Sequence, residues 1–115
     1  MQQNKWFHDG RYDFESISDF KDCMIRGGEV QFIWRGKAYG VFGGVQKTTN
    51  APIQMYVGEG YYQKDGKYYN ALSHEEYDFS DELWADTADE ILEYRVGGDR
   101  LRDVITQVKV IVRTL

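Results

Sequence analysis

The alternation of hydrophobic and polar positions is clearest in "EVQFIWRGKAYGVF", residues 29–42. Arg35 and Gly36 can form a two-residue turn in the middle of this stretch, because glycine readily adopts the positive φ that such turns need. The apolar side chains then stack across the two strands on one face, as an antiparallel pair requires. The pattern therefore predicts a β-hairpin. Its facing pairs would be Val30 with Val41, Phe32 with Tyr39, and Trp34 with Lys37.

Three further segments have the pattern of strands. "IQMYVGEG", residues 53–60, places apolar side chains on one side and predicts a third strand. "YYQKDGKYY", residues 61–69, predicts a second hairpin around Asp65-Gly66, a strong short hairpin signal. "KVIVRTL", residues 109–115, is rich in β-branched side chains and predicts a closing strand. In the second hairpin Tyr62 would face Tyr69, and Gln63 would face Tyr68.

Helical spacing occurs towards both ends of the chain. Ile17, Phe20 and Met24 predict a helix near residues 17–26, with Ser16 or Ser18 as its N-cap. Capping residues and apolar spacing predict two or three short helices in the C-terminal third. The first would follow Ser80 and carry Leu83 and Trp84, the second would open with a Thr87–Glu90 capping box, and the last would follow Asp99 and carry Leu101, Val104, Ile105 and Val108.

Together these elements predict a single α+β domain over residues 1–115, in which residues 1–13 form a flexible N-terminus. An antiparallel sheet of two hairpins plus a C-terminal strand would pack against the N-terminal helix and two or three C-terminal helices. The composition, 42% hydrophobic and 16% aromatic with one proline, is that of a folded domain of common size.

The expected environment is the cytoplasm. No apolar stretch approaches the roughly 18–20 residues that a membrane-spanning helix needs. The first residues lack the apolar core of a secretory signal. Cys23 is the single cysteine, so neither an intramolecular disulfide nor a cysteine-based zinc site is expected.

Charge is distributed unevenly along the chain, whose net charge is −5. Residues 73–94 contain nine carboxylates and no Lys or Arg. Acidic residues favour the first turns of helices, which accounts for some of them but not for the missing cations. Two interpretations stay open: a solvated face, or a surface aimed at a basic partner. The nine are Glu75, Glu76, Asp78, Asp81, Glu82, Asp86, Asp89, Glu90 and Glu93.

Aromatic residues with a polar atom are unusually frequent, with nine Tyr and three Trp beside six Phe. A buried Tyr or Trp must find a hydrogen-bond partner, so some of these side chains are expected at the surface. Tyr and Trp are enriched at binding interfaces, but antiparallel sheets also favour aromatic cross-strand pairs. Surface recognition and sheet packing therefore both remain open.

Catalytic motifs are not found, and the protein is not expected to be an enzyme. His74 lies in "SHEE", but the H-E-x-x-H spacing of a zinc site is missing. "GGVQKTT", residues 43–49, lacks the glycine that a phosphate loop has directly before its lysine, since Gln46 precedes Lys47. No metal site and no cofactor are predicted.

The layout resembles that of small uncharacterised α+β proteins of Gram-positive bacteria and their phages. The matching pieces are the short helix, the "GGEVQFIWRGKAY" hairpin and the tail "VGGDRLRDVITQVKV". The resemblance implies a bacterial or mobile-element context, and no catalytic residue comes with it.

The leading hypothesis is a non-catalytic acidic binding protein of a phage or mobile element, an anti-CRISPR or anti-defence inhibitor. It would mimic nucleic-acid charge and occupy a basic surface of a nucleic-acid-handling protein, such as a CRISPR effector or other nuclease. Direct binding of nucleic acid is not expected from an acidic chain, nor is membrane association. A monomer and a homodimer both remain open. The expected partner-binding residues are Glu75, Glu76, Tyr77, Asp78, Asp81, Glu82, Trp84, Asp86, Asp89, Glu90 and Tyr94.

Two alternatives remain. The protein could sequester a nucleotide-like signal molecule, through base stacking and phosphate pairing. It could also be an immunity protein that neutralises a toxin, which would use the same acidic surface. The ligand-binding residues of the first alternative would be Lys47, Tyr62, Tyr69, Arg100 and Arg102.

Overall fold

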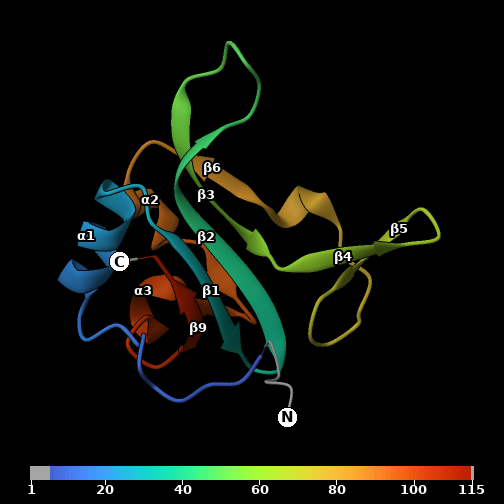
Figure 1. Ribbon diagram of the computed structural model, residues 1–115, viewed down its shortest axis with the longest axis horizontal. Helices are drawn as coiled ribbons and strands as arrows, with labels where there is room; N and C mark the ends of the chain where they lie inside the picture. The colour runs from blue at the N-terminus through green and yellow to red at the C-terminus, as the bar shows by residue number, and fades with distance from the viewer. Residues whose placement is uncertain (1–5, 115) are drawn as a thin grey trace.

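The computed structural model describes residues 6–114, and its centre is a five-stranded antiparallel sheet with strand order β6-β3-β2-β1-β9 (Figure 1). The strands of this sheet are β1 (Glu29–Trp34), β2 (Lys37–Gln46), β3 (Ile53–Glu59), β6 (Leu83–Ala85) and β9 (Lys109–Arg113). Two small sheets pair β4 (Tyr61–Lys64) with β5 (Lys67–Asn70), and β7 (Arg95–Val96) with β8 (Asp99–Arg100). The helices are α1 (Ile17–Ile25), α2 (Ala88–Ile91) and α3 (Leu101–Val104), with a 3-10 turn η1 (Phe79–Asp81). The predicted α+β class is confirmed.

The β1–β2 hairpin has the predicted register, with Val30 opposite Val41 and Phe32 opposite Tyr39. Its turn uses positive φ at both central residues, 49° at Arg35 and 77° at Gly36. This turn geometry matches the right-handed twist of the strands that it joins. The predicted closing strand is found as β9, Lys109–Arg113, which pairs with β1, and Leu115 lies outside the described residues.

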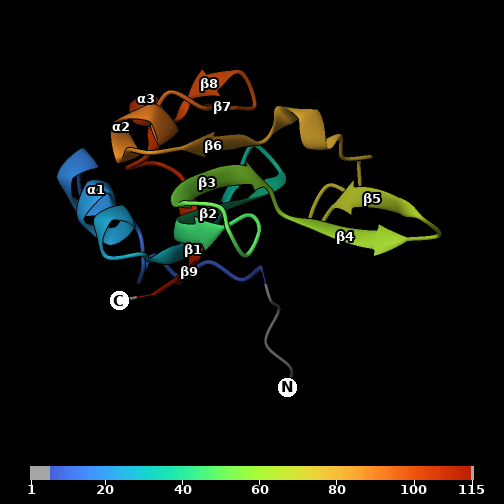
Figure 2. The ribbon, with the colours of Figure 1, turned by 90° about the horizontal axis from the view of Figure 1, so that it is seen from above.

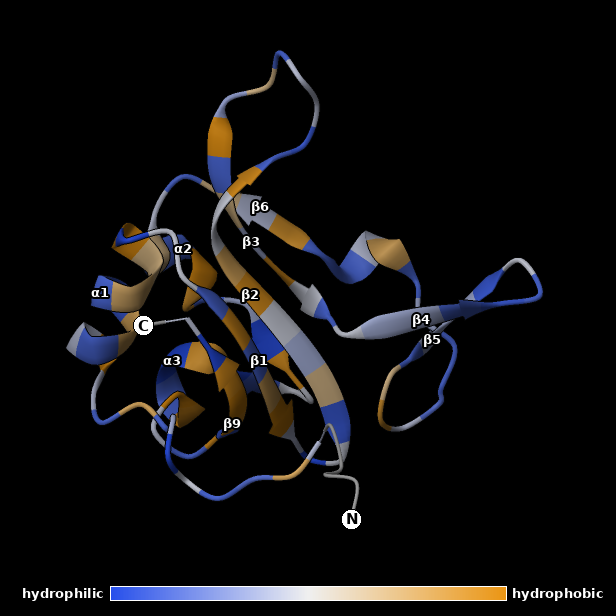
Figure 3. Ribbon diagram, viewed as in Figure 1, coloured by the Kyte–Doolittle hydropathy of each residue, from blue (hydrophilic) through white to orange (hydrophobic). Residues whose placement is uncertain are grey.

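One core cluster lies between the helices and one face of the sheet. Alternate positions of β1 and β2 face it, and Val30, Phe32 and Val41 are completely buried. Helices α1, α2 and α3 gather on this side (Figure 2). In Figure 3 the core elements carry most of the hydrophobic colour, whereas the β4–β5 hairpin is mostly hydrophilic.

Helix α1 begins as predicted, because the Ser16 hydroxyl accepts a hydrogen bond from the Asp19 N–H at 3.1 Å. Its C-terminal end packs closely on β2. A Cβ on Gly43 would lie only 2.2 Å from the Met24 carbonyl oxygen, so glycine is required there for the helix to approach the strand. The strand bulges near this point, where the β2–β3 register shifts between Phe42 and Val45.

The helix predicted after Ser80 is wrong. The chain forms only η1, and Leu83 and Trp84 belong to strand β6, which pairs with β3. Without β6 the backbone groups along the edge of β3 would be left unpaired. The strand also sends Leu83 towards the core and Trp84 to the opposite face, which no helix at this position could do.

Asp99 does not cap the last helix, and this prediction is also wrong. Its carboxylate accepts hydrogen bonds from the Trp34 indole N–H at 2.9 Å and from Arg35 Nε at 2.7 Å. Helix α3 begins after Arg100 without a side-chain cap and is a single turn, Leu101–Val104. The Asp99 carboxylate, which local sequence predicts as a helix cap, thus forms a tertiary contact with Trp34 and Arg35 instead.

The second hairpin has the predicted register, with Tyr62 opposite Tyr69, but it forms a sheet of its own. The chain leaves β3 at Glu59 and enters β4 at Tyr61, and the hairpin projects away from the main sheet (Figure 1). The fully buried Asn70 anchors it. The Asn70 amide bonds both the N–H and the C=O of Ala38 at 3.0 Å, as a neighbouring strand would.

Tyr12 and Asp13 of the N-terminal segment lie against β9, and residues 1–5 of the predicted flexible terminus lie outside the described residues. Asp13 accepts a hydrogen bond from the Val110 N–H at 3.0 Å. The Arg113 guanidinium bonds the Tyr12 carbonyl and the Asp19 carboxylate. Across residues 6–114, no helix is both long enough and apolar enough to cross a membrane.

Candidate functional site: an aromatic groove

The sheet face that points away from the core carries a row of aromatic side chains. Phe42 on β2, Tyr56 on β3 and Trp84 on β6 are neighbours across three adjacent strands. The ring centroids of Phe42 and Tyr56 are 5.9 Å apart, and those of Tyr56 and Trp84 are 4.9 Å apart. All three rings are only partly buried, so the row offers aromatic surface to a ligand.

This row forms one wall of a groove with a volume of about 440 Å³. Trp6, Val45 and Tyr61 add further apolar surface to it. The charged residues that line it are Glu59 and Glu82, and no Lys or Arg is among the described residues that do. The groove therefore combines aromatic faces with negative charge.

The polar atoms of the groove include hydrogen-bond acceptors. A Glu82 carboxylate oxygen accepts a hydrogen bond from the Trp84 indole N–H at 3.3 Å, and the carboxylate also lies near the Tyr56 hydroxyl, whose pKa is raised by burial and further by this carboxylate. The side-chain oxygen of Gln31 is buried and has no hydrogen-bond partner among the described residues. A buried acceptor without a partner costs free energy, which a ligand carrying N–H groups would recover.

A cation already lies over the aromatic row. The Lys47 ammonium, from the loop between β2 and β3, is 5.3 Å from the centre of the Trp84 ring. The electron-rich face of an indole ring attracts a positive charge at this distance. The Trp84 face is therefore able to hold a cation.

The expected aromatic anchors Tyr77 and Tyr94 lie elsewhere. Tyr77 is 4% exposed, and its hydroxyl lies with that of Tyr56 above Gly58, where a Cβ would be 2.4 Å from the Tyr56 oxygen. Burial raises the pKa of both hydroxyls, and the neighbouring Tyr77 raises the pKa of Tyr56 further. The Tyr77 hydroxyl nevertheless has no partner with hydrogen-bond geometry among residues 6–114. Tyr94 is half-buried against the core, and burial raises its pKa as well.

The acidic residues of the 73–94 segment follow the chain from the end of β5 through η1 and β6 to α2 (Figure 2). Glu82 is half-buried in the groove, and the other eight are exposed.

Several of these acidic residues have partners within the protein. Glu75 pairs with Lys37 at 3.0 Å, Asp86 accepts from the Gln54 amide at 3.0 Å, and Asp78 caps η1 through the Ser80 N–H at 2.9 Å. Glu76 joins β5 through a backbone bridge to Tyr69, and Glu90 accepts from the Asp86 N–H at 3.0 Å.

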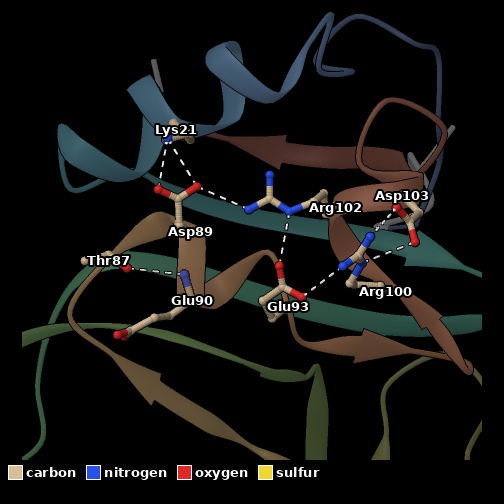
Figure 4. Close-up of polar contacts among 8 residues, drawn as sticks. All are labelled: Lys21, Thr87, Asp89, Glu90, Glu93, Arg100, Arg102 and Asp103. Carbon is tan, nitrogen blue, oxygen red and sulfur yellow. Dashed lines mark hydrogen bonds and ion pairs between the residues drawn. The ribbon is translucent and has the colours of Figure 1, made fainter.

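Two acidic residues of this segment belong to an ion-pair network across the helices (Figure 4). Asp89 pairs with Lys21 at 3.1 Å and with Arg102 at 3.2 Å. Glu93 pairs with Arg102 at 3.2 Å and with Arg100 at 3.3 Å. Lys21 and Arg102 lower the pKa of Asp89, so it stays charged and engaged. Asp89 is thus placed to hold the helices together and not to meet a partner.

The residues expected to bind a small molecule are not brought together. Arg100 and Arg102 lie in the network beside α3, whereas Tyr62 and Tyr69 lie on the projecting β4–β5 hairpin (Figures 1 and 4). The Tyr62 hydroxyl bonds Nδ1 of His74 at 2.9 Å, within that hairpin region. Lys47 lies over Trp84, apart from both groups.

Phe42 and Gln31 are groove residues that the sequence did not single out, and Tyr56 was expected only as one of several tyrosines that could reach the surface. Alternation along β3 already places Tyr56 opposite in direction to Met55 and Val57. The row becomes visible only once β6 is known to pair with β3, and this pairing joins residues far apart in the chain.

Comparisons with protein-family models, with curated proteins and with solved structures each find no match to this chain. Within residues 6–114, no three His, Cys, Asp or Glu side chains come together as metal ligands would.

Proposed function

We propose that this protein is a non-catalytic binding protein that docks through the aromatic groove and the acidic side chains beside it onto a basic surface of another protein. The observation that carries the proposal is the Phe42–Tyr56–Trp84 row. It lies in a groove that carboxylates also line, and the Lys47 ammonium lies over its Trp84 ring. Aromatic side chains in a groove supply binding energy, and surrounding charges of one sign speed association with an oppositely charged surface.

The concrete form of the proposal is an inhibitor of a nucleic-acid-handling protein, such as a CRISPR effector or another nuclease. Two arguments support it: the resemblance to proteins of Gram-positive bacteria and their phages, and the acidic character of a surface that would replace nucleic acid in a basic channel. The carboxylates assigned to contact are those outside the α2–α3 network. They are Glu75, Glu76, Asp78, Asp81, Glu82, Asp86 and Glu90.

An immunity protein against a basic toxin would use the same surface, and the identity of the partner separates the two. Sequestration of a nucleotide-like molecule has less support. Glu59 and Glu82 in the groove would repel the phosphates of such a ligand, and Arg100 and Arg102 are paired with carboxylates elsewhere.

Two variants of equal charge test the proposal. The first is the triple substitution Asp81→Asn, Glu82→Gln and Asp86→Asn, which removes the groove residue Glu82 and the acidic side chains directly before and after β6. The matched control is Glu15→Gln, Asp22→Asn and Asp65→Asn, which removes three negative charges from exposed positions outside the 73–94 segment. Association with a panel of CRISPR effector nucleases of Gram-positive bacteria is followed by surface plasmon resonance at low and high salt.

We expect at least one effector to bind and the first triple variant to associate roughly tenfold more slowly at low salt, because local charge steers encounter. The difference should shrink at high salt, where charges are screened. The control triple should stay within a factor of two of the unmodified protein. Equal effects of the two triples, or no binding to any effector, would contradict the proposal.

A further inference from the structure

We propose that the groove binds an arginine side chain of the partner, with its guanidinium stacked on Trp84 and hydrogen-bonded to Glu82. This inference rests on the proposed function, because it names the group on the basic partner that the groove receives. The evidence is the set of acceptors in the groove, the cation already on the ring, and the shape of the groove wall.

The acceptors require a ligand with several N–H groups. The Glu82 carboxylate accepts from the Trp84 indole only at 3.3 Å and is near a single further donor, the Tyr56 hydroxyl, so it can accept more hydrogen bonds. The side-chain oxygen of the groove residue Gln31 has no hydrogen-bond partner among the described residues. Glu59 also lines the groove, and one of its carboxylate oxygens already accepts a hydrogen bond from the Asn70 amide at 2.7 Å. A guanidinium carries five N–H donors and no acceptor, and its paired donors match a carboxylate.

Lys47 shows where the positive charge would lie. Its ammonium lies 5.3 Å from the centre of the Trp84 ring, and within residues 6–114 it has no ion pair or hydrogen bond. The loop that carries it is exposed from Gln46 to Asn50. Lys47 can therefore leave the ring at small cost, and until it leaves it competes with an incoming cation.

The shape of the site favours arginine over lysine. The guanidinium is planar, stacks on aromatic rings and is less strongly hydrated than an ammonium, so it loses less on entering a groove. The rings of the row are tilted against one another, by 37° between Phe42 and Tyr56 and by 60° between Tyr56 and Trp84, so the plane would stack on Trp84 while the other rings add apolar contact. Lysine would contact one ring with a compact charge that keeps its water.

Three peptides that differ at one side chain test the inference on the full chain. They are acetylated and amidated Gly-Arg-Gly, Gly-Lys-Gly and Gly-citrulline-Gly, where citrulline has nearly the shape of arginine without its charge. Binding is followed by NMR through the Trp84 indole N–H signal, assigned by its loss in Trp84→Phe. We expect the arginine peptide to shift this signal saturably and to bind at least fivefold more tightly than the lysine peptide. The citrulline peptide should give no saturable shift.

Two lysine variants and one glutamate variant complete the test. Lys47→Met should tighten binding of the arginine peptide about threefold, because the ring face is no longer occupied. Lys64→Met removes an exposed charge from the projecting hairpin and should change nothing. Glu82→Gln should weaken binding of the arginine peptide and remove the preference over lysine.

The inference is overturned if the arginine and lysine peptides bind equally, if citrulline binds as well as arginine, or if Lys47→Met and Lys64→Met behave alike. These results would leave the proposed function standing wherever the triple variant beside the groove still slows association with an effector. The opposite pattern, selective arginine binding without any difference between the two triple variants, contradicts the proposed function and leaves the groove as an arginine site.

Discussion

Asn70 is the residue that joins the projecting hairpin to the main sheet. Its side-chain oxygen accepts from the N–H groups of Ala38, Leu72 and Ser73, at 3.0, 3.0 and 3.1 Å. Its amide nitrogen donates to the Ala38 carbonyl and to Glu59. The Asn70 side chain thus satisfies the N–H of the buried Ala38 and shares the Ala38 carbonyl with the Gly60 N–H, which bonds it at 2.9 Å.

Asn70→Ala should lower the free energy of unfolding by about 3 kcal/mol, because each buried backbone group left without a partner costs about 1–3 kcal/mol. Urea denaturation followed by circular dichroism measures the change. Asn50→Ala, in the exposed loop between β2 and β3, is the control and should leave stability within about 0.5 kcal/mol. A loss below about 1 kcal/mol for Asn70→Ala would show that water replaces the amide.

The role of Asn70 could not be predicted from the sequence, because an asparagine that follows a hairpin strand is usually part of a turn. Its partner Ala38 is 32 residues away. Trp84 was predicted as a contact residue on a helix, and it lines the groove from a strand instead. For both residues, the contacts of the side chain depend on segments that are far away along the chain, so local sequence does not reveal them.

At the scale of elements, the hairpins and the Thr87-capped helix α2 were predictable, whereas the fate of the segment after Ser80 and the cap of α3 were not. Both hairpin turns use positive φ at two adjacent residues, including 53° at Asp65 and 80° at Gly66, and this information is local. The capping residues Ser80 and Asp99 are also local signals. However, the residues after Ser80 pair with β3 as strand β6, and Asp99 accepts a hydrogen bond from the Trp34 indole. Tertiary pairing outweighs a cap, which contributes only about 1 kcal/mol.

Helix α1 and strand β9 are joined by an ion pair that should make stability depend on pH. Arg113 is 9% exposed and bonds the Asp19 carboxylate, and this hydrogen bond lowers the pKa of Asp19. A lowered pKa in the folded state stabilises the protein above the pKa of the unfolded state, about 3.9. That stability is lost as the pH falls through the folded-state pKa.

Asp19→Asn should therefore lower the free energy of unfolding by about 1.5 kcal/mol at pH 7, the scale of one hydrogen bond to a charged group. The difference from the unmodified protein should begin to diminish below about pH 4, where the unfolded chain binds a proton at Asp19, and should disappear below the lowered folded-state pKa of Asp19. Urea denaturation between pH 2 and pH 7 measures both effects. Asp22→Asn, an exposed position on the same helix, is the control. A difference that stays constant down to pH 2 would contradict the role of the carboxylate charge.

At the scale of the whole molecule, charge along the chain does not map directly onto charge in space. Residues 73–94 contain no cation, yet Lys21, Arg100 and Arg102 fold onto the α2 part of this segment and engage Asp89 and Glu93. The sequence predicts the acidity of the protein and its α+β class, because composition and local periodicity determine them. It cannot predict which carboxylates are neutralised, since that depends on how α1, α2 and α3 pack.

The network also predicts how salt affects the stability of the helical layer. Arg102 bridges Asp89 and Glu93, and Arg102→Gln leaves two carboxylates facing one another without the cation between them (Figure 4). The variant should melt a few degrees lower than the unmodified protein at about 10 mM salt, where the Debye length is about 30 Å. At about 1 M salt that length falls to about 3 Å, and the two melting curves should coincide. Lys109→Gln, which removes an exposed charge from β9, should show no such dependence. If the Arg102→Gln deficit persists at high salt, the guanidinium acts through packing and not through charge.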